Sequence, residues 1–246
     1  MKESLDPYGQ HDVATLKEIW ESRKEYIEKD LWVIRNFLSE EELAWTMELA
    51  NDPKDWYTTM RSPYGGNIKN KFIGYVAEYD EGGTMILPGP GSYIEQTRWQ
   101  EWGIEDRFEA VVPPQWARAT AFQSFFEVPD EQIIEELGHD VDYAMEFHYE
   151  RDDEDGTSGK PATSSAEAEI TAALSVYLND DFQGGALEFK NKDYSIEPEA
   201  GMLVNVPMDK EFEHRVGKVV GGTRHTIYGR SWDNINNRHF STNEDC

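Results

Sequence analysis

Apolar and polar residues alternate in short runs through the C-terminal third of the chain, over residues 170–232. The runs are rich in Val, Leu, Tyr and Phe, and Asn-Asp, Gly-Gly and Glu-Ala-Gly sequences separate them. Alternation with a period of two, interrupted by such turn residues, is typical of antiparallel strands joined by tight turns. Similar runs over residues 118–128 and 143–150 predict two further strands upstream. The chain is therefore predicted to be mainly β, with supporting helices.

The N-terminal part mixes helical and strand patterns. Apolar residues recur at roughly helical intervals over residues 12–30, which predicts an amphipathic helix. Residues 31–38 have the pattern of a strand, and residues 39–50 that of a second helix. Ser39 followed by Glu42 has the form of a capping box, in which each side chain satisfies a free backbone N–H at the start of the helix.

Between these elements the sequence is less regular. Residues 51–114 contain Gly-Gly and Pro-Gly interruptions and predict connecting strands and a loop. An acidic helix is expected over residues 129–138, and the polar residues 151–168 are expected to form a surface loop or a lid over substrate. Four aromatic residues lie just before the β region: Trp99, Trp102, Phe108 and Trp116. They are expected either to pack on the sheet or to line a substrate groove.

Size, charge and cysteine content narrow the function classes. The 246 residues are 38% hydrophobic, which is enough for a buried core in one domain. Lys and Arg total 23 against 49 Asp and Glu, and the net charge of −26 opposes nucleic acid as a partner and favours a basic peptide or a small molecule. The single cysteine, Cys246, excludes an intrachain disulfide. Because there is no signal peptide and no run of about 20 apolar residues, we expect a cytoplasmic protein without a membrane span.

Two histidines and a carboxylate form a candidate metal site. His148 and Glu150 are two positions apart in a predicted strand, so their side chains share one face, and His214 lies in another predicted strand. Two imidazoles and one carboxylate suit a non-haem Fe(II) enzyme that handles oxygen. Asp152, on the same face if the strand continues, is the rival carboxylate, and a site without metal is the remaining alternative. Strands joined by a Gly-Gly turn would hold His214 and Arg224 on neighbouring inward positions.

Three segments carry a resemblance to a known family: LSVYLNDDFQGGALEF at residues 174–189, EAGMLVNVP at 199–207 and HRVGKVVGGTRHT at 214–226. In order and spacing they resemble the Fe(II)- and 2-oxoglutarate-dependent dioxygenases, and most closely the prolyl 4-hydroxylase-like branch. The resemblance runs over residues 118–233 and implies a double-stranded β-helix core there, of the jelly-roll, cupin-like kind. Residues 1–117 would then form a support layer of helices and strands and residues 234–246 a polar tail, all in one structural domain.

The resemblance also implies a role for each candidate residue. The two histidines and a carboxylate would bind Fe(II), and the family usually has aspartate where this chain has Glu150. Arg224 would hold the distal carboxylate of 2-oxoglutarate with its planar guanidinium, and Thr226, on the same strand face, would add a hydrogen bond. Tyr177 falls where relatives place a tyrosine that reaches the same carboxylate. The alternatives are a surface salt bridge for Arg224 and simple core packing for Tyr177.

The activity that the resemblance implies is hydroxylation of an unactivated C–H bond, with a prolyl residue of a peptide or protein as the substrate suggested by the branch. Fe(II) is the implied cofactor, 2-oxoglutarate and O2 are the cosubstrates, and succinate and CO2 are released. Two alternatives stay open: the same chemistry on a free amino acid or other small molecule, and a catalytically inactive β-barrel binding protein.

Overall fold

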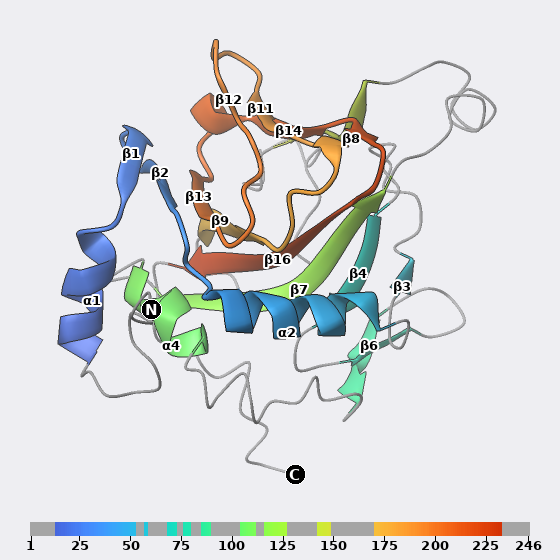
Figure 1. The fold of residues 1–246 in the computed structure, drawn as a ribbon, viewed down its shortest axis with the longest axis horizontal. Helices are drawn as coiled ribbons and strands as arrows, with labels where there is room; N and C mark the ends of the chain where they lie inside the picture. Colours follow the sequence, from blue (N-terminus) through green and yellow to red (C-terminus); the bar gives the residue numbers. More distant parts are fainter. Residues whose placement is uncertain are drawn as a thin grey trace.

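The computed structural model describes residues 13–52, 57–58, 68–72, 76–79, 85–89, 104–111, 116–126, 142–148 and 170–232. Within these segments the chain forms one large and one small antiparallel sheet, and the helices lie on the side of the large sheet that faces away from the small sheet (Figure 1). The structure is mainly β with few helices, which confirms the predicted fold class.

The large sheet combines strands from both halves of the sequence, whereas the small sheet is built from the C-terminal half alone. The described strands of the large sheet are, in order, β1 (Glu25–Glu28), β2 (Leu31–Ile34), β13 (Leu203–Pro207), β9 (Ile170–Tyr177), β16 (Thr223–Trp232), β7 (Trp116–Phe126), β4 (Ile68–Phe72) and β3 (Tyr57–Thr58). Those of the small sheet are β12 (Ser195–Ile196), β11 (Leu187–Phe189), β14 (His214–Gly217) and β8 (Tyr143–His148). Two separate pairs are β10 (Gln183–Gly184) with β15 (Val219–Val220), and β5 (Val76–Tyr79) with β6 (Met85–Gly89).

The helical elements are α1 (Val13–Glu21), α2 (Glu40–Asn51), α4 (Ile104–Val111) and the short 3-10 helix η1 (Lys210–Phe212). α2 runs along the large sheet in Figure 1, opposite the small sheet. None of the helices in the described segments has the length and apolar character needed to cross a membrane.

Side chains of the large sheet alternate between two hydrophobic layers. On β9, Leu174 and Val176 pack in the layer that contains the helices, together with Trp20 of α1. Ala173 and Tyr177, at the intervening positions, pack in the layer shared with the small sheet. Strand alternation therefore leaves one set of positions facing the space between the sheets, where side chains from both sheets meet.

The helix predicted over residues 12–30 is wrong in its second half. α1 ends at Glu21, and β1 then pairs with β2 in an antiparallel hairpin, in which Asp30 adopts a φ of 66°. Ile27, which seemed to continue the apolar helix face, is 39% exposed. Backbone pairing with β2 overrides the local helical pattern, and periodicity does not report such tertiary pairing.

Other predicted elements are confirmed where the structure describes them. β7 and β8 are the two upstream strands, and β2 covers the first part of the strand expected over residues 31–38. α2 has the predicted capping box, because the Ser39 hydroxyl accepts from the Glu42 N–H at 3.2 Å and the Glu42 carboxylate accepts from the Ser39 N–H at 2.7 Å. The predictions for residues 129–138, 151–168 and 234–246 lie outside the described residues.

A buried ion pair joins α2 to α4. Arg107 donates to the two carboxylate oxygens of Glu42 at 2.5 and 3.2 Å, and to the carbonyl of Phe37 at 3.1 Å. The Arg107 and Glu42 side chains are 6% and 5% exposed. Of the four aromatic residues singled out in the sequence, Phe108 of α4 is buried in this layer, and the side chains of the other three lie outside the described part of the chain.

Removing one partner of this pair should cost much of the protein's stability. We expect Glu42→Ala to lower the free energy of unfolding by about 3–5 kcal/mol, because the Arg107 charge then stays buried without its carboxylate. Urea unfolding followed by circular dichroism measures the change. Glu40→Ala, in the same helical turn but exposed, is the matched control and should change stability by less than about 0.5 kcal/mol. Equal losses in the two variants would contradict a dominant role for the buried pair.

Candidate active site

Two predicted metal ligands lie side by side in the small sheet. β8 and β14 are adjacent antiparallel strands, and His148 pairs directly with His214. The centroids of the two imidazole rings are 4.6 Å apart, with the ring planes inclined by 55°. The pairing brings together two side chains that are 66 positions apart in the sequence. The structure thus places the two imidazoles close enough to share one metal ion.

Irregular pairing between β8 and β14 places His148 opposite His214. Along β14, His214 and Val216 are two positions apart, whereas their partners His148 and Met145 on β8 are three positions apart, and a second register shift follows between Val216 and Gly217. The extra residue bends the strand and shifts the alternation of its side chains, as bulges beside active sites commonly do. The bulge brings His148 into direct register with His214, an arrangement that strict alternation along β8 does not predict.

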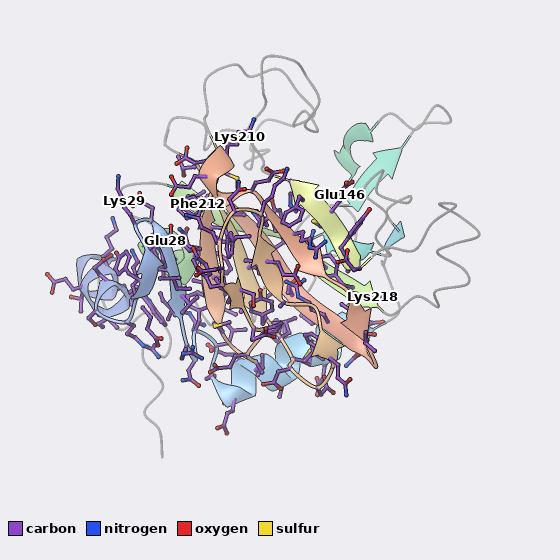
Figure 2. All side chains as sticks on the ribbon, turned by 90° about the horizontal axis from the view of Figure 1, so that it is seen from above. Glu28, Lys29, Glu146, Lys210, Phe212 and Lys218 are labelled. Carbon is purple, nitrogen blue, oxygen red and sulfur yellow. The ribbon has the colours of Figure 1, made fainter. Side chains whose placement is uncertain are left out.

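Each imidazole is anchored through the same ring nitrogen. His148 Nδ1 lies 2.8 Å from the carbonyl of Glu146, and His214 Nδ1 lies 2.9 Å from the carbonyl of Phe212. A carbonyl only accepts, so Nδ1 carries a proton in both rings, and Nε2 is the nitrogen left to face a metal ion. Figure 2 labels Glu146 on β8 and Phe212 on η1, the two residues whose carbonyls hold the rings. Such second-sphere hydrogen bonds are typical of metal-binding histidines, because they fix the tautomer and orient the ring.

His214 is held neutral by its surroundings. The residue is 6% exposed, and the Phe189 ring lies 6.2 Å from its ring between centroids. Burial, together with the nearby His148 ring, lowers the pKa of His214 to about 3. The imidazole therefore stays neutral at pH 7, and its Nε2 lone pair does not compete with a proton for a metal ion.

The carboxylate ligand stays a prediction. Glu150 and its rival Asp152 both lie outside the described residues. Within the described segments, no third His, Cys, Asp or Glu joins the two histidines in a metal-binding group.

The three predicted cosubstrate-binding residues form one buried cluster. Thr226 on β16 pairs directly with Tyr177 on β9, and Arg224 stands two residues before Thr226 on the same face. The Arg224 guanidinium carbon lies 4.8 Å from the centre of the Tyr177 ring and 4.6 Å from that of Phe125. The exposed fractions of Arg224, Tyr177 and Thr226 are 3%, 0% and 1%, so a surface salt bridge does not account for Arg224.

Each member of the cluster carries a buried polar atom without a hydrogen-bond partner among the described residues. These atoms are Arg224 Nε, Tyr177 Oη and Thr226 Oγ1. Buried polar groups are nearly always paired, because an unmade hydrogen bond costs free energy. Three such atoms within one cluster fit a ligand rich in acceptors, and a carboxylate matches the planar guanidinium best. The unsatisfied hydroxyl also distinguishes Tyr177 from a tyrosine that only fills the core.

The structure corrects the predicted relation between the second histidine and the arginine. His214 belongs to the small sheet and Arg224 to the large sheet, so the two do not lie on neighbouring strands. β15 intervenes, and the chain then turns through Gly221 and Gly222, whose φ values of 64° and 142° favour glycine. The turn carries the chain from one sheet to the other, which places the metal-ligand candidates and the carboxylate anchor on different sheets.

One glycine in the cluster was predicted only as part of a turn. Gly185 has a φ of 68°, and a Cβ atom built there would lie 3.0 Å from Cδ of Arg224 and 3.0 Å from the ring of Phe182. The Gly-Gly sequence signals a turn, but only the fold shows that its second glycine makes room for the Arg224 side chain. Asn179 was likewise missed, since its contacts form only when β9 and β16 come together.

Comparison with known proteins supports the resemblance found in the sequence. Residues 139–230 match the family model of the 2OG-Fe(II) oxygenase superfamily. The matched segment contains both histidines and the Arg224 cluster, and the match confirms the family resemblance found in the sequence. It supports an oxidoreductase of the dioxygenase type, as predicted. Among curated proteins, none matches the sequence.

Solved structures support the predicted fold. A prolyl-4-hydroxylase from Pseudomonas putida superposes with a TM-score of 0.51 at 14% identity, covering 91% of this chain and 100% of its own. An oxidoreductase of the 2OG-Fe(II) oxygenase family from Burkholderia pseudomallei has a TM-score of 0.51 at 13% identity, covering 92% of each chain. A Trichoplax adhaerens prolyl hydroxylase, in complex with a hypoxia inducible factor peptide fragment, has a TM-score of 0.51 at 14% identity, covering 94% of this chain and 92% of its own. This likeness confirms the double-stranded β-helix fold.

Proposed function

We propose that this chain is an Fe(II)- and 2-oxoglutarate-dependent dioxygenase that hydroxylates a prolyl residue of a peptide or protein. The observation that carries the proposal is the pair of adjacent imidazoles, the buried His214 and the partly buried His148, each with Nδ1 bonded to a carbonyl and Nε2 left as a ligand. A buried arginine cluster suited to a dicarboxylic acid supports the choice of 2-oxoglutarate.

The residues divide into two groups. His148 and His214 would bind iron through Nε2, with Glu150 as the third ligand and Asp152 as its rival. Arg224 would bind the distal carboxylate of 2-oxoglutarate, with further hydrogen bonds from Thr226 and Tyr177. When bound, the iron and the 2-oxo acid supply the oxidising chemistry, with O2 consumed and succinate and CO2 released.

The protein's own contribution is orientation and exclusion of water. The two carbonyl anchors fix the histidine tautomers before any ligand arrives, so little reorganisation is needed on binding. Phe189 packs against Phe212 and beside His214, with ring centroids 6.5 and 6.2 Å apart respectively, and makes this side of the site apolar.

A prolyl substrate is the finer part of the proposal. The Pseudomonas putida and Trichoplax adhaerens structures with this fold are prolyl hydroxylases, the second with a peptide bound. At 14% identity they support the fold, and the substrate is carried over as a proposal. The net charge of −26 favours a peptide that is basic around its proline.

The direct test is turnover. The purified protein is incubated with Fe(II), 2-oxoglutarate and acidic, neutral or basic proline-containing peptides, and succinate is measured by NMR while the peptides are measured by mass spectrometry. We expect iron-dependent succinate formation and the gain of one oxygen atom on proline in the basic peptides. Succinate without peptide oxidation would move the substrate towards a small molecule. If neither succinate nor oxidised peptide forms with any peptide, and no succinate forms without peptide, the enzymatic proposal is wrong.

The acidic charge predicts how turnover depends on salt. Attraction between this chain and a basic peptide acts over the Debye length, which shrinks from about 10 Å at 0.1 M to about 3 Å at 1 M ionic strength. We expect KM for the basic peptide to rise several-fold across that range while kcat stays constant. Steady-state kinetics with an uncharged peptide of the same proline sequence provide the control, and a parallel rise in its KM would argue against electrostatic steering.

A further inference from the structure

Asn179 binds the backbone of β16 on both sides of Arg224. The Asn179 side-chain Nδ2 donates to the carbonyl of Thr223 at 2.8 Å, and its Oδ1 accepts from the N–H of His225 at 2.8 Å. These two backbone groups belong to the residues immediately before and after Arg224. A single carboxamide therefore holds the stretch of strand that carries the buried guanidinium.

The Asn179 side chain replaces backbone hydrogen bonds at the end of the β9–β16 pairing. Tyr177 opposite Thr226 is the last pair of β9 and β16 at this end, and the Leu178 N–H still donates to the His225 carbonyl at 2.9 Å. Beyond this point β9 has ended. The Asn179 side chain then donates to and accepts from β16 in place of the backbone N–H and C=O groups that a longer β9 would have offered.

The orientation of the carboxamide follows from its third bond. Its Nδ2 also donates to the carboxylate of Asp181 at 2.6 Å. Rotating the amide by half a turn would place its NH2 group against the His225 N–H, and its oxygen against the Thr223 carbonyl and the Asp181 carboxylate. All three contacts would become repulsive, so the network defines a single orientation.

The start of β16 has few other constraints on this side. Gly221 and Gly222 precede it in conformations that favour glycine, with φ values of 64° and 142°. On the opposite edge Arg224 pairs with Phe125 of β7, and the ring of His225 lies 2.7 Å from the hydroxyl of Ser124. The strand is thus held by β7 on one edge and, at this position, by the Asn179 side chain on the other.

We propose that Asn179 is a positioning residue for the distal carboxylate of the cosubstrate, acting through Arg224. The inference rests on the proposed function of Arg224 and extends it to a residue that does not touch the ligand. Loss of the carboxamide leaves the Thr223 carbonyl and the His225 N–H without these partners and lets the end of the strand move. The Arg224 guanidinium then spends less time in the position that binds the distal carboxylate, while the two histidines on the small sheet are unaffected.

The test compares two 2-oxo acids. Under anaerobic conditions the Fe(II)-loaded protein is titrated with 2-oxoglutarate and with 2-oxobutyrate, which lacks the distal carboxylate, and the charge-transfer absorbance is followed. For Asn179→Ala we expect 2-oxoglutarate to bind roughly tenfold more weakly, the scale set by the loss of one or two hydrogen bonds. Affinity for Fe(II) and for 2-oxobutyrate should match the wild type, which a general structural defect would not allow.

Three variants sharpen the result. Asn179→Asp keeps the size and the acceptor but cannot donate to the Thr223 carbonyl, so it should also weaken 2-oxoglutarate binding and serves if the alanine variant does not fold. Asn205→Ala removes a buried asparagine that likewise donates to a backbone carbonyl, that of Asp30 at 2.7 Å, and should leave 2-oxoglutarate binding unchanged. In an Arg224→Gln background, Asn179→Ala should add less than about a twofold effect, because the coupled residues act as one unit.

Distinct outcomes overturn the two proposals. Wild-type affinity for 2-oxoglutarate in both Asn179 variants overturns the positioning role alone. Equal weakening for 2-oxoglutarate and 2-oxobutyrate also overturns it, because the effect would then be structural. A wild-type protein that binds Fe(II) and shows no band with either acid overturns the proposed function, and the positioning role falls with it.

Discussion

Replacing His214 with alanine should abolish the charge-transfer absorbance that we expect when Fe(II) and 2-oxoglutarate are added anaerobically to the wild-type protein. The His214 ring is 6% exposed, neutral at pH 7 and anchored by the Phe212 carbonyl, so it is prepared for metal binding before the ion arrives. Mutating residues that merely orient a ligand already costs about 10–100-fold in metal affinity. Loss of the ligand itself should weaken Fe(II) binding by more than about a hundredfold and remove turnover.

The matched control is the histidine on the other face of the large sheet. His225 is partly buried and its ring lies against Ser124, away from the imidazole pair, so His225→Ala should retain Fe(II) binding. Fe(II) affinity is measured by competition with a chelator, and folding is checked by the thermal midpoint. If His214→Ala keeps the band at wild-type intensity, the iron is not bound at the imidazole pair and the assignment of the site is wrong.

Replacing Arg224 with glutamine should weaken binding of 2-oxoglutarate by about 10–100-fold while leaving Fe(II) affinity unchanged. A hydrogen bond to a charged group is worth about 1.5–3 kcal/mol, and burial of the guanidinium at 3% exposure removes most of the competition from water. Arg224→Lys keeps the charge but loses the planar fork, so it should recover only part of the affinity.

The surface arginine next to His214 provides the control for this second prediction. Arg215 donates to Glu188 at 2.6 Å and to Asp142 at 2.9 Å, in an ion-pair network on the small sheet. Arg215→Gln should leave 2-oxoglutarate affinity unchanged, since its charge is already paired with carboxylates. Titration of the charge-transfer band gives both dissociation constants. Equal effects of the two substitutions would mean that general electrostatics, rather than a specific anchor, attracts the cosubstrate.

Local sequence patterns predicted the structure correctly where it depends on a single strand or on the start of a single helix. Alternation along β16 correctly put Arg224 and Thr226 on one face, because side-chain direction in a strand depends only on position. The capping box of α2 was equally accessible, since its two bonds join residues three positions apart. The same reasoning failed for residues 12–30, where pairing with a neighbouring strand decides the conformation.

The sequence by itself determined which chemistry is available: two histidines, an arginine, a tyrosine and a threonine on predicted strands, in the order of the oxygenase family. Tertiary structure decided how they meet. The bulge in β8 brings His148 into register with His214, the glycine turn moves Arg224 to the opposite sheet, and the Asn179 carboxamide replaces a backbone rung beside it. These features depend on hydrogen bonds between strands far apart in the chain, whose register is set by packing between the sheets, and no local pattern encodes that register.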